Sequence, residues 1–291
     1  MPDNPRQVEV SNRDKVFWPA TGFTKGELVD YYDTVAPIMV PHLAGRPITL
    51  RRWPNGVGGQ TFFQKNAPQH RPPWMGTVHL GDVDYLRIDE PAALRWAANS
   101  AAIEVHPGLA QAPHLDRPTA LVLDLDPGEG CDVITCCRLA LILREYLARA
   151  GLEAWPKTSG SKGLQMYVPL NNSTTYDDTR PFGEALARVA ESEHPDLVTS
   201  TVKKSERRKK VLIDWAQNAP SRTTVAVYSV RARDRPTVST PVTWSEVESA
   251  RTVADLTFDV SAVPARIDRL GDLMAPVLSV KQRLPDGGLR T

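Results

Sequence analysis

An α+β fold is the class that this sequence predicts, on three observations. Stretches of strand length and of helix length follow one another without the strict strand–helix alternation of a doubly wound sheet. Two helix starts carry a capping-box pattern, at 24–27 and at 243–246, which indicates where those helices begin. The chain has 291 residues, 41% of them hydrophobic, and can therefore bury one large core or two modest ones.

The first half of the chain is expected to combine two helices with short strands. Thr24 is the expected cap of a helix over 25–40, with Glu27 as its capping-box partner. Pro91 suits the first turn of a second helix over 92–102. Strands, marked by apolar and β-branched residues, are expected within 8–19 and at 48–53, 61–65, 85–88 and 103–106.

The second half repeats this mixture around one apolar strand at 120–126. A helix over 132–150 should end at Gly151, because glycine favours the backbone conformation that follows a helix. The last segment, after the capping box at 243–246, is expected to be helical and polar. The remaining expectations are strands at 153–158, 165–169, 211–215 and 223–231, and a helix at 181–192.

Composition excludes several classes of protein. No apolar run is long enough to cross a bilayer and the N-terminus lacks a signal-peptide pattern, so we expect a cytoplasmic protein with no membrane partner. The three cysteines form no paired CxxC units, so neither a disulfide framework nor a zinc site is expected. The net charge of +1 gives no indication for or against nucleic acid.

The strand at 120–126 carries the strongest chemical signal. Side chains alternate along a strand, so Asp124 and Asp126 should share one face while Leu123 and Leu125 occupy the other. Two adjacent carboxylates at the end of a buried strand repel each other unless a cation lies between them. Mg²⁺ and Mn²⁺ prefer such oxygen ligands. Asp214, in another apolar strand, would supply the third ligand that a two-metal site needs.

Other segments indicate phosphate contacts, each weakly. The loop 159–163 is glycine-rich and contains Lys162, but it lacks the Walker A spacing. Six cations lie within 203–210, directly before the Asp214 strand. Phe62 and Phe63 are consecutive, so we expect one ring in the core and the other free to stack on a base.

Taken together and in this order, these motifs resemble the polymerase domain of the bacterial end-joining DNA ligase D family, within the archaeo-eukaryotic primase superfamily. The resemblance covers about residues 8–275 and rests on a set of short motifs. They are RWPNG at 52–56, FF at 62–63, EVH at 104–106, DLDPGEG at 124–130, SGSKG at 159–163 and DWAQN at 214–218, with Asp14-Lys15 and Thr24-Lys25 near the N-terminus.

The resemblance implies a primase-type core with an RRM-like mixed or antiparallel sheet flanked by helices, in one domain spanning 1–291. Its parts would be a DNA-end and 5′-phosphate segment at about 1–70, a catalytic core at about 71–240 and a helical tail at about 241–291. It also implies metal-dependent transfer of nucleotides, often ribonucleotides, to a DNA 3′-hydroxyl. Implied partners are gapped or primed DNA with a 5′-phosphate, nucleoside triphosphates, a DNA ligase and an end-binding protein, near the bacterial nucleoid.

Residue roles follow from the same resemblance. The catalytic and metal-binding residues, for two Mn²⁺ or Mg²⁺ ions, would be Asp124, Asp126 and Asp214. The incoming NTP or dNTP would be bound by Arg51, His106, Ser159, Lys162, Gln217 and Arg231. DNA would be bound by Asn12, Lys15, Lys25, Phe62, Phe63 and Arg207. Two residues depart from the family pattern: Gln165 replaces a histidine and Arg51 a lysine, and the contact that Gln165 makes to the nucleotide is left open.

Three other functions are weighed against gap filling. One is de novo priming, which the same superfamily performs. A second is a non-catalytic module that docks on 5′-phosphorylated DNA ends, although three converging acids would then have no purpose. The third is a haloacid-dehalogenase phosphatase, whose nucleophile begins a similar apolar-strand D-x-D, but Gly128 stands where those enzymes usually have Thr or Val.

Overall fold

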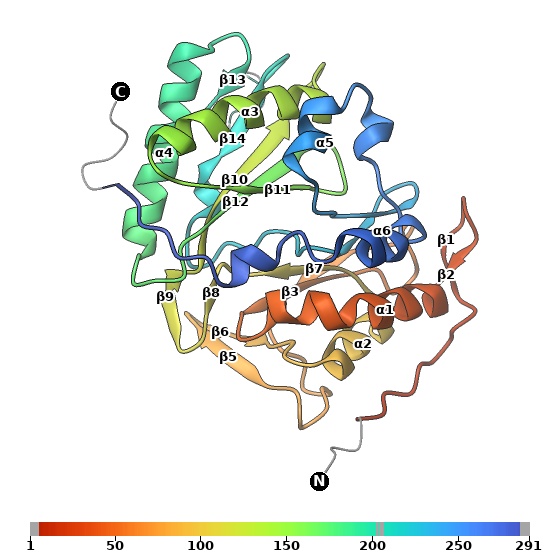
Figure 1. The fold of residues 1–291 in the computed structure, drawn as a ribbon. Coiled ribbons are helices and arrows are strands. Elements are labelled where there is room, and N and C mark those ends of the chain that lie inside the picture. Colours follow the sequence, from red (N-terminus) through yellow and green to blue (C-terminus); the bar gives the residue numbers. More distant parts are fainter. Residues whose placement is uncertain (1–5, 202, 204–206, 286–291) are drawn as a thin grey trace.

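Two five-stranded sheets lie on opposite sides of a cleft, and helices pack on the outer face of each (Figure 1). The computed structural model describes residues 6–201, 203 and 207–285. The α+β prediction is confirmed, since strands pair mostly antiparallel and helices intervene irregularly. The helices are α1 Lys25–Leu43, α2 Pro91–Asn99, α3 Val133–Arg149, α4 Tyr176–Glu193, α5 Trp244–Ser249 and α6 Ala262–Leu270, with 3₁₀ turns at Trp215–Gln217, Val253–Leu256 and Ala275–Leu278.

One sheet is centred on β10 (Ala120–Pro127) and occupies the upper half of Figure 1. Leu121, Leu123 and Leu125 point to α3 and α4 and are fully buried there. Burial of such side chains contributes about 1.5–3 kcal/mol each, so this face holds the sheet to its helices. The strand order is β11 (Trp155–Thr158), β12 (Leu164–Pro169), β10, β14 (Val211–Asp214) and β13 (Val198–Thr199).

The other sheet comes from the first third of the chain and lies on α1 and α2 in the lower half of Figure 1. Its core face carries Ile48, Leu50, Ile103 and Val105, all fully buried. The residues that alternate with them face the cleft. The strands are β3 (Ile48–Arg52), β4 (Phe62–Gln64), β5 (Thr77–Leu80), β6 (Val83–Leu86) and β7 (Ala102–Pro107).

Three two-stranded ribbons complete the structure. The hairpin of β15 and β16 lies beside the glycine-rich loop, because Thr237 donates to the carbonyl oxygen of Gly160 at 2.6 Å. The tail returns to the sheet formed by β3 to β7, where Val263 and Val277 join its core. The ribbons pair β1 (Val16–Trp18) with β2 (Phe23–Thr24), β8 (Ala110–Gln111) with β9 (His114–Pro118), and β15 (Val230–Ala232) with β16 (Pro236–Val238).

Both predicted capping boxes are confirmed, the helix predicted at 181–192 is present but starts earlier, and the strand predicted at 223–231 is wrong. Helix α4 begins at Tyr176 instead of 181, because Thr175 and Asp178 form a capping box that the sequence reading missed, and Pro181 lies inside the helix. The strand expected at 223–231 is mostly irregular, since Tyr228 has a φ of +63°. Only its last residues enter β15, which pairs with β16.

Candidate active site

The three predicted acids come together on the cleft face of the β10 sheet. Asp124 pairs across the sheet with Asp214 of β14 on one side and with Gln165 of β12 on the other. Residues directly opposite one another in adjacent strands point to the same face. Asp126 follows two residues after Asp124 and therefore shares that face, as the sequence predicts.

Burial, and after it mutual repulsion, disfavours the charged forms of Asp124 and Asp126. Loss of hydration and the charge of Asp126 raise the pKa of Asp124, while a hydrogen bond from Gln165 opposes the change. Loss of hydration and the charge of Asp214 likewise raise the pKa of Asp126. The protein alone therefore compensates these charges poorly, which is the condition that a bound cation relieves.

The donor set fits divalent ions of the Mg²⁺ or Mn²⁺ type, because all three groups are carboxylates. The oxygens of Asp214 accept from the backbone N–H of Ala216 at 3.1 Å and from Nε2 of Gln217 at 3.0 Å. Each oxygen keeps a second lone pair, which a metal can take. Within the described ranges, no group of three or more His, Cys, Asp or Glu side chains lies close enough together to hold a metal ion as the side chains stand.

The row of polar residues continues to Lys157, which the sequence reading missed. Lys157 of β11 pairs with Gln165, so four strands present Lys157, Gln165, Asp124 and Asp214 side by side. Lys157 is fully buried and donates to Oγ of Ser239 at 2.5 Å. Burial lowers the pKa of its ammonium to about 7, although the charge of Asp124 opposes this. Alternation in the strand at 153–158 was the signal that could have revealed it.

Asn218 holds β10 where β14 has ended. Its side chain accepts from the backbone N–H of Val122 at 2.9 Å and donates to the carbonyl of Val122 at 2.8 Å. The amide thus replaces the missing strand partner of the residue two positions before Asp124. This explains the position of Asn218 in the DWAQN segment, where Gln217 binds Asp214 and Asn218 binds the strand of Asp124.

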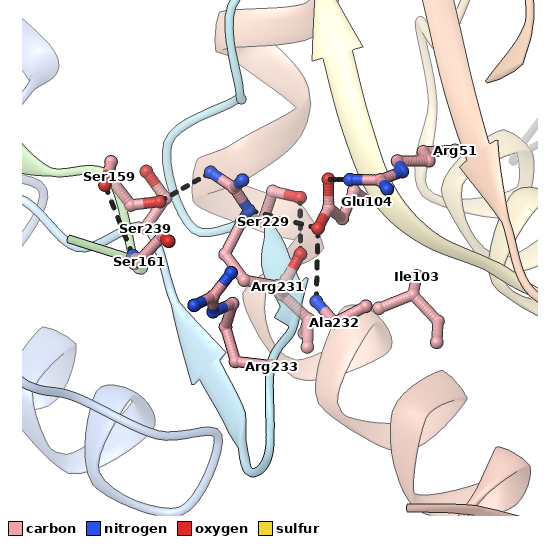
Figure 2. Close-up of polar contacts among 12 residues, drawn as sticks. Arg51, Ile103, Glu104, Ser159, Ser161, Ser229, Arg231, Ala232, Arg233 and Ser239 are labelled. Carbon is pink, nitrogen blue, oxygen red and sulfur yellow. Dashed lines mark hydrogen bonds and ion pairs between the residues drawn. The ribbon is translucent and has the colours of Figure 1, made fainter. Parts of the chain in front are cut away.

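The glycine-rich loop is closed on itself by Ser159. Its hydroxyl accepts from the backbone N–H groups of Ser161 at 3.2 Å and Gly163 at 3.1 Å. Gly160 has a φ of +66°, and a Cβ there would lie 2.6 Å from backbone atoms of β16. Arg231 of β15 donates from Nη1 to the carbonyl oxygen of Ser159 at 2.7 Å (Figure 2). The loop is therefore fastened to the β15–β16 hairpin, beside the acids.

The opposite wall of the cleft is formed by β3, β4 and β7. The ring of Phe63 contacts that of His106 edge-on, with centroids 5.9 Å apart, and the guanidinium of Arg51 lies 5.1 Å from the Phe63 ring. Phe62 points to the other side of β4, beneath Arg52. The expectation that one phenylalanine is buried is wrong: Phe62 is 46% exposed and Phe63 57%, because short β4 lies at the edge of its sheet.

One cavity of about 500 Å³ joins these two walls. Asp214 and Arg51 lie next to it through their contacts with Asp124 and Phe63. The lining includes cationic residues that the sequence reading did not select, Lys65 and Arg222. Eight of the predicted site residues line it: Phe63, His106, Asp124, Asp126, Ser159, Lys162, Gln217 and Arg231.

The predicted 5′-phosphate residues lie apart from the cavity, near the start of α1. The exposed ammonium of Lys15 is held by the carbonyl of Pro54 at 2.7 Å, and that of Lys25 by the carbonyl of Ser11 at 2.6 Å. Burial and the charge of Lys15 lower the pKa of Lys25, so the two cations are close. Asn12 begins the turn that leads to Lys15, from whose backbone N–H its carbonyl oxygen accepts at 3.1 Å, and it has a φ of +52°. Neutral oxygens hold both ammonium groups, that of Lys15 at the surface and that of buried Lys25.

The basic run at 203–210 is partly described. Residues 204–206 lie outside the described residues. Lys210 and Lys209 pack against the turn after β10 through backbone bonds with Gly128 and Glu129. The charge of Arg207 opposes the rise that burial causes in the pKa of Asp126, which places this predicted DNA-binding residue near the acids.

This geometry defines a class of protein: a primase-type fold with a nucleotide-sized space beside three carboxylates. Comparison with known proteins shows to which family within that class the chain belongs. The profile of the LigD primase-polymerase domain family matches residues 24–274. The chain belongs to that family. It is 42% identical to the multifunctional non-homologous end joining protein LigD of Mycolicibacterium smegmatis over 277 residues, which are 93% of this chain and 36% of that protein. The bifunctional LigD of Bacillus subtilis is 31% identical over 254 residues, 87% of this chain and 41% of that protein.

Among solved structures, the polymerase domain from Mycobacterium tuberculosis Ligase D in complex with DNA matches with a TM-score of 0.87 and 40% identity, over 95% of this chain and 99% of that one. The likeness confirms the primase-type fold that the motifs imply. The chain spans somewhat more than a third of the length of the curated relatives it matches. None of the described helices is long and apolar enough to cross a membrane.

Proposed function

We propose that this protein is a metal-dependent nucleotidyltransferase that adds ribo- or deoxyribonucleotides to a DNA 3′-hydroxyl and fills short gaps during end joining. The observation that carries the proposal is the placement of Asp124, Asp126 and Asp214 on one wall of a cavity shared with the loop 159–163 and Arg231. Carboxylates that bind cations, beside groups that bind phosphate, are the combination that phosphoryl transfer requires.

In this proposal the three aspartates hold two Mn²⁺ or Mg²⁺ ions, which when bound neutralise charge on the attacking hydroxyl and the leaving pyrophosphate. Ser159, Lys162, Gln217 and Arg231 hold the triphosphate, because they line the cavity with donors and positive charge. On the opposite wall, His106 lies near the sugar. Arg51 and the exposed ring of Phe63 lie there near the nucleobases, while the exposed ring of Phe62, on the other side of β4, is available to a template base.

DNA recognition would rest on the segment before and within the start of α1. Lys15 and Lys25 are cations held by neutral oxygens next to a helix N-terminus, an arrangement that suits a phosphate monoester. We propose that they bind the 5′-phosphate across a gap, with Asn12 beside them and Arg207 near the template strand. The whole chain would act as one primase-polymerase domain, alongside a DNA ligase and an end-binding protein, in the bacterial cytoplasm at the nucleoid.

The test is incorporation of a labelled nucleotide with Mn²⁺ on three DNAs: a one-nucleotide gap with a 5′-phosphate, the same gap with a 5′-hydroxyl, and an unprimed single strand. We expect fastest incorporation at the phosphorylated gap and a loss of that preference in Lys15→Ala. Asp124→Ala, Asp126→Ala and Asp214→Ala should each abolish incorporation and keep DNA binding. Synthesis on the unprimed strand would indicate a primase, and DNA binding without any incorporation would indicate a docking module.

A further inference from the structure

Glu104 is a buried acid that none of the roles above uses. It lies in β7, where its two neighbours Ile103 and Val105 belong to the core, and it is only 1% exposed. Its carboxylate points away from that core, between β3 and the β15–β16 hairpin (Figure 2). Glu104 therefore lies behind the cavity wall and is absent from its lining.

The carboxylate binds four groups from three strands. Oε2 contacts Nε2 of His106 at 2.9 Å and lies 3.7 Å from Nη1 of Arg51. Oε1 accepts from the backbone N–H of Ala232 at 3.1 Å and pairs with Nε of Arg231 at 3.2 Å. One buried group thus reaches the histidine on one wall of the cavity and the arginine of the other.

Arg231 extends this chain of contacts to the glycine-rich loop at 159–163. Its Nε faces Glu104 while its Nη1 donates to the carbonyl oxygen of Ser159, so the guanidinium spans the two (Figure 2). The path from His106 through Glu104 and Arg231 to Ser159 therefore connects the opposite walls of the cavity. The orientation of each member depends on the carboxylate at the centre.

The electrostatics keep this carboxylate ionised. Burial by itself raises the pKa of Glu104, but the hydrogen bond with His106 and the charge of Arg231 outweigh it and hold the pKa at about 2. A neutral amide at this position would leave the guanidinium of Arg231 without its counter-charge. A buried cation that has lost its partner turns toward another acceptor or draws in water.

We propose that Glu104 is the positioning residue for the incoming nucleotide, holding His106 and Arg231 in the register in which one nucleoside triphosphate contacts both. This inference rests on the proposed function, because it assigns those two residues to the nucleotide. It assigns Glu104 no contact with substrate. Its effect is expected on the binding and alignment of the nucleotide and not on the binding of DNA.

The alternative is that the ion pair between Glu104 and Arg231 serves stability alone. The chain offers a matched control in Glu246, whose carboxylate pairs with Arg266 at 2.6 Å. Arg266 is 8% exposed, and neither residue lines the cavity. Glu246→Gln therefore weakens an arginine–carboxylate pair outside the site in which the arginine is buried and the carboxylate is partly exposed.

The experiment compares Glu104→Gln, Glu246→Gln and the unaltered protein. The measured quantities are the KM and kcat for the incoming nucleotide on phosphorylated gapped DNA, the Kd for that DNA and the Tm. We expect Glu104→Gln to raise KM at least about tenfold, because small misplacements of binding groups weaken substrate contacts steeply. Its Kd for DNA should stay within about twofold of the unaltered protein, and Glu246→Gln should lower Tm with KM unchanged.

A double-mutant cycle separates positioning from stability. If Glu104 acts partly through Arg231, Glu104→Gln should raise KM by a clearly smaller factor in the Arg231→Gln background than in the unaltered protein, the remainder acting through His106, whereas independent effects would multiply. If Glu104→Gln does not fold, Glu104→Asp serves instead. It keeps the negative charge but is one methylene shorter, which moves the carboxylate away from Arg231 and His106, and the same rise in KM is expected. An unchanged KM in the folded variant, or full multiplication in the cycle, overturns the inference. Absence of incorporation by the unaltered protein would instead overturn the proposed function.

Discussion

Gly160 offers a sharp test of how the glycine-rich loop at 159–163 is held in place. Its φ of +66° lies in the region that costs a residue with a Cβ about 1–2 kcal/mol. A Cβ would also lie 2.6 Å from the nitrogen of Ser239 and 2.6 Å from the carbonyl carbon of Val238, distances that real Cβ atoms do not show. Since both are backbone atoms, they cannot rotate away and the loop must move, at an overpacking cost of about 1–3 kcal/mol.

Gly160→Ala should therefore lower the free energy of unfolding by about 2–5 kcal/mol. It should also raise KM for the nucleotide, because a displaced loop separates the Ser159 carbonyl from Arg231. Gly151→Ala is the matched control: Gly151 has a φ of +73° but nothing within 4 Å of its Cβ position. Gly151→Ala should lower the free energy of unfolding only by the cost of placing a residue with a Cβ at positive φ, about 1–2 kcal/mol, and should leave KM unchanged.

The assays are urea unfolding followed by circular dichroism, and steady-state incorporation on gapped DNA. The difference between the two alanine variants isolates the close approach of the loop to β16. Equal destabilisation by both, together with an unchanged KM in Gly160→Ala, would refute the reasoning. That result would mean that the loop is free to move and that the hairpin does not hold it.

Three further predictions concern the polar row and its support. Asp124→Asn should stabilise the metal-free protein above about pH 5, because the raised pKa of the Asp124 carboxyl means that its ionisation opposes folding. The same variant should lose the stabilisation that Mn²⁺ gives the unaltered protein. Urea unfolding in EDTA and in Mn²⁺ measures both effects. Lys157→Met should stabilise the protein most below pH 7, because burial lowers the pKa of the Lys157 ammonium to about 7 and the charged form opposes folding there. The gain should shrink progressively toward pH 10.5, the ordinary pKa of lysine, and Tm measured against pH checks this. Asn218→Ala should cost about 2–4 kcal/mol by unpairing both backbone groups of Val122, measured by urea unfolding.

Local sequence alone sufficed for features set by the geometry of one element. The alternation of a strand has a period of two, so Asp124 and Asp126 had to share a face opposite Leu123 and Leu125. Capping boxes involve residues three apart, so the start of α1 could be read from Thr24 and Glu27. The motif set also indicated the family, because it combines many short segments whose order is specific.

The sequence alone could not reveal which strands pair, and several site contacts depend on that pairing. Glu104 and Arg231 are 127 positions apart, and their ion pair exists only because β7 and β15 meet. Lys157 was read as one residue of a strand, and only the register of β11 with β12 places it in the row with Asp124.

What this sequence determined by itself is the chemistry available: carboxylates, cations and a glycine turn at positions whose local structure is predictable. What only the tertiary structure decided is the partner of each charge. An ionisable group in a protein takes its pKa and orientation from whatever packs around it, and those neighbours come from distant segments. Asp124 beside Asp214, and Glu104 between His106 and Arg231, are such neighbours.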